Sequence, residues 1–113
     1  MNEQRRAPRI VRHLFVRYRC LEQGQTDWCS SPLLDLSSGG ARFRSEHRFA
    51  PDSILEMQLL LPIQPITLKA RVAWSGPLHA GLTELGVTFS PDDIAIQRTI
   101  DGAVAHFLRK QES

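Results

Sequence analysis

The clearest structural signal in the chain is the stretch ITLKARVAW, residues 66–74. Apolar side chains alternate there with polar or small ones at every second position, which is the spacing of a β-strand with one buried face. The apolar series ends on Trp74, which we therefore expect to point into the core. Ser75-Gly76-Pro77 follows directly and is predicted to end the strand.

The same alternation extends outward from this stretch in both directions. It predicts further strands at about 12–19, 28–36, 41–44, 54–61 and 82–89. Turn-forming residues separate these segments, for example Ser37-Ser38-Gly39-Gly40. Pro32, inside the second segment, favours an edge strand or a bulge there. Six short antiparallel strands tend to close into a barrel or sandwich, because closure removes exposed sheet edges.

The apolar period changes after the last strand. Ser90 suits a helix N-cap and Pro91 the first helical position. Apolar residues then recur at steps of three and four, at Ile96, Ile100, Ala103, Val104, Phe107 and Leu108. This spacing predicts an amphipathic helix over about 91–110 that covers one end of the sheet. The predicted fold is mainly β, with one C-terminal helix.

Length and composition indicate one small domain. The chain has 113 residues, of which 42% are apolar and 23% are charged. Its longest apolar patch, Leu59-Leu60-Leu61, is far too short to span a membrane. The N-terminus lacks the apolar core of a signal peptide. Two cysteines, Cys20 and Cys29, are too few for a disulfide framework, and we expect free, half-buried thiols. We therefore expect a soluble, cytoplasmic protein without membrane insertion.

Positive charge is concentrated at the N-terminus. Residues 1–19 contain six arginines and one acid, a sum of +5, whereas the net charge of the whole chain is +2. The remaining residues therefore sum to −3. Every base in this segment is arginine, whose planar fork matches phosphate oxygens and the guanine edge. The cluster indicates an anionic partner, although a solvated tail also explains it.

No catalytic constellation stands out. The four histidines are scattered, and none has metal-ligand spacing to another histidine, cysteine or carboxylate. No phosphate-binding loop, dinucleotide fingerprint or nucleophile elbow is present. We therefore expect no enzyme activity, no metal and no cofactor.

Two short motifs remain, and each alone has a structural explanation. Arg5 and Arg9 form Arg-x-x-x-Arg, and residues 35–40 form Asp-x-Ser-x-x-Gly, which is also simply a good β-turn. In this order, one before the first strand and one between the second and third, they resemble the PilZ domain family. The stretches 70–74 and 84–89 are similar to later strands of that family.

The resemblance implies a six-stranded antiparallel β-barrel with one C-terminal helix. It also implies a bacterial receptor for the second messenger cyclic di-GMP. Carried over by position, the ligand-binding residues are Arg5, Arg9, Asp35, Ser37 and Gly40. Further contacts are expected from Arg6, Gly39 and Arg42. Gln4 stands where family members that bind a stacked ligand dimer often have an arginine, so the number of bound ligands stays open.

The chemistry of these residues suits the ligand. Guanidinium groups can bind guanine or phosphate, and a carboxylate accepts the N1–H and N2–H donors of guanine. We expect residues 1–11 to form a flexible arm on a barrel domain of residues 12–113. Ligand binding would order this arm and relay the signal to a partner protein.

Two other functions stay open from the sequence. One is a PilZ-fold adaptor that binds proteins without nucleotide. The other is a small β-barrel that binds single-stranded nucleic acid, which the basic N-terminus favours. Aromatic residues are only 7% of the chain, and most alternate into the core. Few bases could therefore stack on the surface, and we do not expect nucleic-acid binding.

Overall fold

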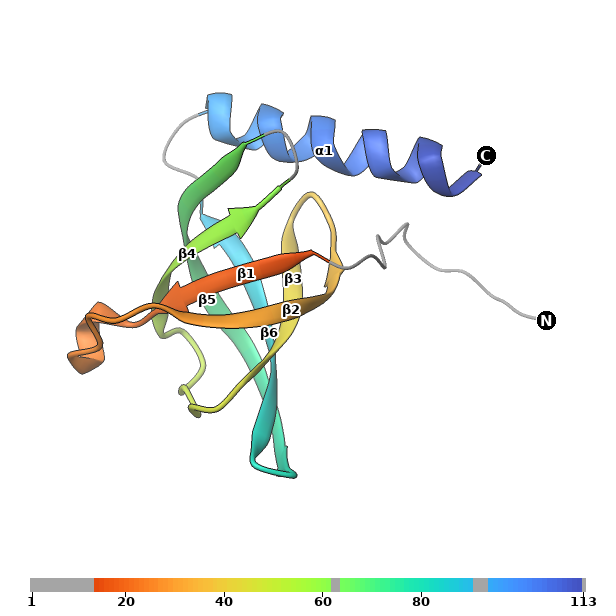
Figure 1. Cartoon of the computed structure of the whole chain (residues 1–113). Helices are drawn as coiled ribbons and strands as arrows, with labels where there is room; N and C mark the ends of the chain where they lie inside the picture. Colours follow the sequence, from red (N-terminus) through yellow and green to blue (C-terminus); the bar gives the residue numbers. More distant parts are fainter. Residues whose placement is uncertain (1–13, 62–63, 91–93, 113) are drawn as a thin grey trace.

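The structure is a computed structural model that describes residues 14–61, 64–90 and 94–112. Its elements are β1 (Phe15–Arg19), the 3-10 helix η1 (Leu21–Gln23), β2 (Cys29–Leu36), β3 (Gly40–Ser45), β4 (Ile54–Leu60), β5 (Pro65–His79), β6 (Leu82–Ser90) and α1 (Ile94–Glu112). The strands form a closed antiparallel barrel in the order β1-β2-β3-β6-β5-β4, and α1 lies across one end of it (Figure 1). The predicted fold class is confirmed.

Alternation along each strand builds the core. Val16 and Tyr18 on β1 face inward, as do Leu55, Met57 and Leu59 on β4, and all five are buried. The same period on β3, β5 and β6 fills the barrel from the other walls. The sequence prediction of these inward faces is confirmed, because burial of one strand face fixes which residues point inward.

Three aromatic rings pack against one another in the barrel core. The ring centroid of Tyr18 lies 4.9 Å from that of Phe43 and 6.5 Å from that of Phe49. The Tyr18 hydroxyl donates to Ser45 Oγ at 3.1 Å, and Ser45 Oγ also accepts the backbone N–H of His47. Burial raises the pKa of Tyr18, because the ionised phenolate would lose its hydration there.

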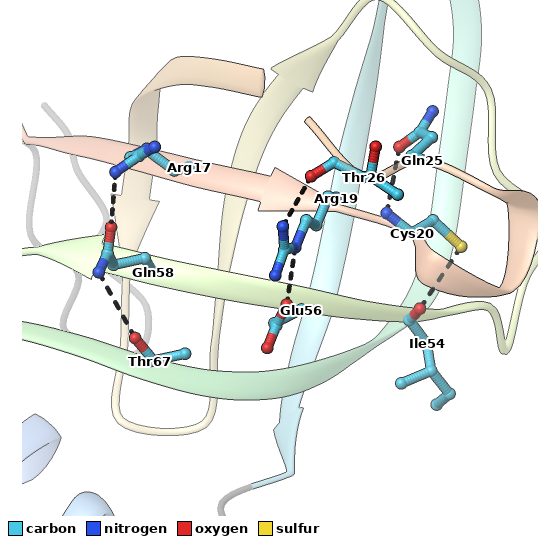
Figure 2. Close-up of polar contacts among 9 residues, drawn as sticks. All are labelled: Arg17, Arg19, Cys20, Gln25, Thr26, Ile54, Glu56, Gln58 and Thr67. Carbon is cyan, nitrogen blue, oxygen red and sulfur yellow. Dashed lines mark hydrogen bonds and ion pairs between the residues drawn. The ribbon is translucent and has the colours of Figure 1, made fainter. Parts of the chain in front are cut away.

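The outer faces of β1, β4 and β5 carry rows of polar side chains (Figure 2). Arg17 donates to Gln58 Oε1 at 3.1 Å, and Gln58 donates in turn to Thr67 Oγ1 at 3.5 Å. One step along, Arg19 Nε pairs with Glu56 Oε1 at 2.7 Å. These rows follow the strand register, since directly opposed residues share a face.

The β1–β2 connection begins with Cys20 and ends with Trp28, and Cys29 is the first residue of β2. Both cysteines are free, as predicted; Cys29 is half-buried as expected, whereas Cys20 is fully buried. The thiol of Cys20 lies 3.5 Å from the carbonyl oxygen of Ile54 on β4 (Figure 2). The guanidinium carbon of Arg19 lies 4.3 Å from the centre of the Trp28 ring, so this half-buried indole is a cation–π partner.

Helix α1 is fixed to the barrel at its inward face. Ile100 is fully buried and Val104 nearly so, and both belong to the barrel core. Gln97 Nε2 donates to the carbonyl oxygen of Ser38 at 3.0 Å, which ties the helix to the β2–β3 turn. The helix runs to Glu112, close to the predicted end, and its predicted first residues, 91–93, lie outside the described residues.

The predicted end of β5 is wrong. Strand β5 does not end at Ser75–Pro77 but continues to His79. Its pairing with β6 shifts register twice, and such bulges accommodate a proline that cannot donate to the ladder. Pro32 pairs with Phe15 of β1, and the pairing of β2 with β3 begins at Leu33. Of the two predicted alternatives, the bulge lies next to Pro32, between Leu33 and Asp35.

Candidate functional site

The Asp-x-Ser-x-x-Gly motif forms the turn that joins β2 to β3. Ser37 donates both its backbone N–H (2.9 Å) and its hydroxyl (3.3 Å) to the carbonyl oxygen of Gly40. The backbone N–H of Phe89 donates to the carbonyl oxygen of Gly39 at 2.9 Å. Hydrogen bonds from Ser37 therefore stabilise the turn internally, and a hydrogen bond from Phe89 ties it to β6.

Gly40 is required by the packing of this turn. A Cβ atom at Gly40 would overlap the carbonyl oxygen of Val87 and lie 3.2 Å from its carbonyl carbon. Both atoms belong to the backbone of β6, which cannot move aside as a flexible side chain could. A Cβ at Gly39, in contrast, would meet no atom within 4 Å.

A row of four residues crosses the barrel wall beside the turn. Asp35 on β2 lies opposite Arg42 on β3, Arg42 lies opposite Gly86 on β6, and Gly86 lies opposite Trp74 on β5. Directly opposed residues project to the same face of a sheet. Arg42 alternates with the buried Ala41 and therefore faces outward, so the row belongs to the outer wall of the barrel.

Arg42 bridges two carboxylates in this row. Its Nε pairs with Asp35 Oδ2 at 2.7 Å, and its Nη1 pairs with Glu84 Oε2 at 2.6 Å. The hydrogen bond to Asp35 is the largest cause that raises the pKa of Arg42, and it outweighs the opposite effect of partial burial. Only 8% of the Asp35 side chain is exposed, against 36% for Arg42. The sequence predicts Arg42 as a further ligand contact but does not predict this bridge.

Trp74 lies at the far end of the row, and its predicted burial is wrong. The side chain is 42% exposed. The register shift between Val72 and Trp74 reverses the alternation, so the residue that continues the apolar series faces outward. Its indole rests on Gly86, where a Cβ atom would come within 2.6 Å of Trp74 Cζ2. An exposed aromatic surface therefore stands beside Arg42 and Asp35.

These side chains enclose an open hollow of about 470 Å³. Its lining includes Asp35, Ser37, Gly39, Gly40, Arg42 and Trp74. Its volume falls in the range of small-molecule sites. It offers a carboxylate, a hydroxyl, a guanidinium and an aromatic surface, which together suit a flat ligand with hydrogen-bond donors.

The structure thus brings together five of the residues predicted from the sequence. The other three, Arg5, Arg6 and Arg9, lie outside the described residues, as does Gln4. Trp74 is the lining residue that the sequence reasoning assigned wrongly. Within the described ranges, no three histidine, cysteine or carboxylate side chains are placed to hold a metal ion.

A second and larger cavity, of about 620 Å³, opens elsewhere on the barrel. It lies beside the first half of β2, beyond the segment that pairs with β3. Trp28, Pro32, Leu34 and Leu82 give it apolar walls, with Arg44 and Glu46 also in its lining. It contains none of the motif residues.

Among the described helical residues, no segment combines the length and the apolar character that crossing a bilayer requires.

The fold is a small helix-capped β-barrel with a polar and aromatic hollow on its outer wall. The sequence model of the PilZ domain matches residues 3–106, and the chain belongs to the PilZ domain family. The resemblance expected from the two motifs is therefore confirmed. No curated protein matches the chain.

Several solved structures share the fold. The apo form of MrkH from K. pneumonia has a TM-score of 0.78 at 16% identity, covering 98% of this chain and 55% of that one. The Bacillus subtilis inhibitor of motility, MotI/DgrA, gives 0.72 at 17% identity, covering 96% and 52%. The PilZ domain of Escherichia coli YcgR with c-di-GMP gives 0.70 at 14% identity, covering 96% and 95%. The chain thus spans about half the length of MrkH and MotI, and these likenesses show the fold alone.

Proposed function

We propose that the chain is a receptor for cyclic di-GMP. The observation that carries the proposal is the convergence of Asp35, Ser37, Arg42 and Trp74 on one hollow beside the β2–β3 turn. Membership of the PilZ domain family supports it. So do the c-di-GMP complexes of the YcgR PilZ domain and of MrkH, which have the same fold.

The described part of the hollow suits a guanine base. Asp35 is an acceptor for the N1–H and N2–H donors, and the Ser37 hydroxyl, which donates its proton to the Gly40 carbonyl oxygen, can accept a further hydrogen bond. The exposed indole of Trp74 offers a surface on which a base can stack, an interaction worth about 1–3 kcal/mol per base. Gly39 has open space around its Cα and lets a flat ligand approach the backbone.

The same residues do not attract phosphates. Asp35 and Glu84 contribute two negative charges and Arg42 one positive charge, so the three sum to −1. Cyclic di-GMP carries two negative charges, and the described side of the site would repel it. The attraction must come from other cations, and Arg5 and Arg9, with Arg6, are the ones that the motif supplies. A bidentate arginine binds phosphate strongly.

The barrel side of the site carries net negative charge, whereas the arginines of the N-terminal segment are positive. This separation supports a switch in which ligand binding orders the N-terminal segment. Residues 1–11 act as an arm whose arginines close over the ligand on the barrel of residues 12–113. The ordered arm then presents a new surface to a downstream partner protein. The measurement is amide hydrogen exchange of residues 1–11 with and without saturating ligand. Protection that does not change on binding would contradict the switch.

Isothermal titration tests the receptor itself. We expect the wild type to bind cyclic di-GMP and not GMP, and to release the ligand chemically unchanged. Arg9→Ala and Asp35→Ala should each abolish binding. Arg44→Ala is the matched control, because Arg44 is an exposed arginine of β3 that does not line the hollow.

The stoichiometry decides between one ligand and a stacked pair, the question raised by Gln4. Absence of heat at high ligand concentration would refute the receptor and leave a protein-binding adaptor as the alternative. Product formed on long incubation would point instead to an enzyme.

A further inference from the structure

We propose that Arg42 is a positioning residue that holds Asp35 for the ligand, and that Glu84 sets how strongly the hollow binds a dianion. The inference rests on the proposed function and adds to it a residue, Glu84, that belongs to neither motif. Replacing Glu84 by glutamine should therefore make ligand binding tighter.

The geometry of the bridge follows from the barrel register. Arg42 lies between Asp35 on one neighbouring strand and Gly86 on the other. Because Gly86 has no side chain, the guanidinium finds no partner directly across from it and reaches diagonally to Glu84 instead. The two contacts, 2.7 Å from Nε and 2.6 Å from Nη1, fix both ends of the guanidinium.

A fixed guanidinium in turn fixes Asp35. The Asp35 side chain is only 8% exposed, and a carboxylate that is so deeply buried needs a charged or hydrogen-bonding partner. Arg42 bonds one oxygen, Oδ2, through a single N–H. A carboxylate has lone pairs for several donors, so this bond orients Asp35 while a further donor can still be accepted. The ligand then meets an acceptor that is already in place.

Glu84 has the opposite effect on a dianionic ligand. Its side chain is 33% exposed, and it adds one negative charge next to the hollow. At separations of about 8–10 Å, with a water-like dielectric, one such charge weakens the binding of a dianion by roughly 1.5- to twofold at physiological salt and by roughly three- to fourfold at low salt. Glutamine has the same shape and keeps an acceptor oxygen for Arg42 Nη1. Glu84→Gln therefore removes the charge and retains the bridge.

The opposite wall of the barrel provides a matched control. Arg19 on β1 pairs through Nε with Glu56 on β4, also at 2.7 Å (Figure 2). These side chains are 25% and 29% exposed, close to the values for Arg42 and Glu84. In the strand order, β1 and β4 lie across the barrel from β6 and β3. Glu56→Gln thus changes the same charge in the same kind of ion pair, far from the hollow.

The experiment is isothermal titration of the full chain with cyclic di-GMP at low and physiological salt. We expect Glu84→Gln to bind about 1.5- to twofold more tightly at physiological salt and about three- to fourfold more tightly at low salt. Arg42→Met should bind at least about tenfold more weakly, because it removes the bond that orients Asp35 and the positive charge that lies beside Glu84. Arg42→Lys keeps the charge but not the fork that spans both carboxylates, so its affinity should fall between Arg42→Met and wild type. Glu56→Gln and Arg19→Met should stay within about 1.5-fold of wild type at low salt, where the gain expected for Glu84→Gln is largest.

Each outcome has a defined meaning. A loss of affinity in Glu84→Gln, or a gain that salt does not alter, would overturn the role of Glu84. Wild-type affinity in Arg42→Lys or Arg42→Met would overturn the positioning role. Thermal unfolding identifies a variant that does not fold. If Arg42→Met fails to fold, Arg42→Lys tests the role of Arg42 and Glu84→Gln tests the role of Glu84. Absence of binding by the wild type would refute the proposed function, and this inference with it. If the wild type binds, the variants test the roles of Arg42 and Glu84 alone.

Discussion

Gly86→Ala should displace the aromatic surface of the hollow, the Trp74 indole, although no ligand-binding side chain is itself replaced. The new Cβ would come within 2.6 Å of Trp74 Cζ2 and closer still to two other ring atoms. Carbon atoms pack at about 3.5–4.0 Å, so the indole would have to move outward by roughly 1 Å or more. Because Trp74 is already 42% exposed, it can move while the barrel stays folded.

The expected loss follows from stacking. A base stacked on an aromatic side chain contributes about 1–3 kcal/mol, which is roughly a five- to hundredfold change in dissociation constant. We expect Gly86→Ala to weaken cyclic di-GMP binding by that factor, and Trp74→Ala to do the same. Gly102→Ala is the control, because a Cβ at that exposed helical glycine meets nothing within 4 Å.

A double-mutant cycle provides the strictest test. If Gly86 acts only through Trp74, the double variant should bind no more weakly than Trp74→Ala alone. Titration calorimetry measures all three affinities, and thermal unfolding checks that each variant is folded. Wild-type affinity in Gly86→Ala, or additive losses in the double variant, would refute the reasoning.

Three predictions concern stability. Gly40→Ala should destabilise the barrel by about 1–3 kcal/mol or more, because its Cβ overlaps the backbone of Val87; urea unfolding measures this, and wild-type stability would contradict it. Ile100→Ala removes a fully buried side chain between α1 and the barrel and should cost about 2–5 kcal/mol, with early hydrogen exchange of the helix as the sign that it detaches. Tyr18→Phe should cost about 1 kcal/mol at neutral pH by removing the hydrogen bond to Ser45. Because burial raises the folded-state pKa of Tyr18 above 10.0, the wild type should lose stability as the pH rises above about 10, and Tyr18→Phe should lose less; parallel losses in urea unfolding at pH 8 and 10.5 would argue against this.

The sequence predicted the barrel because burial of one face enforces a two-residue period. The period places Leu55, Met57 and Leu59 inward whatever their neighbours are, so local reasoning suffices there. It fails where the pairing shifts by one residue. The bulge after Val72 turns Trp74 outward, and nothing in the local stretch signals it, because a bulge is set by the partner strand.

The candidate site was likewise predictable only where its residues lie close together in the sequence. Asp35 and Ser37 were identified because their motif is local to one turn. The pairing of Arg42 with Glu84 was not, because the two residues are 42 positions apart and meet only through the register of β3 with β6. The arginine arm remains a prediction, since Arg5 and Arg9 lie outside the described residues.

The glycine that ends the motif has a consequence for reading other sequences of this fold. In a related barrel that does not bind a nucleotide, Asp35 could be replaced without displacing the backbone of β6. Gly40 could not be replaced in this way, because a side chain there would overlap the Val87 carbonyl. A glycine at this position therefore reports the architecture and not the ligand. When a related chain is sorted as a receptor or an adaptor, the carboxylate that opens the motif is the informative residue.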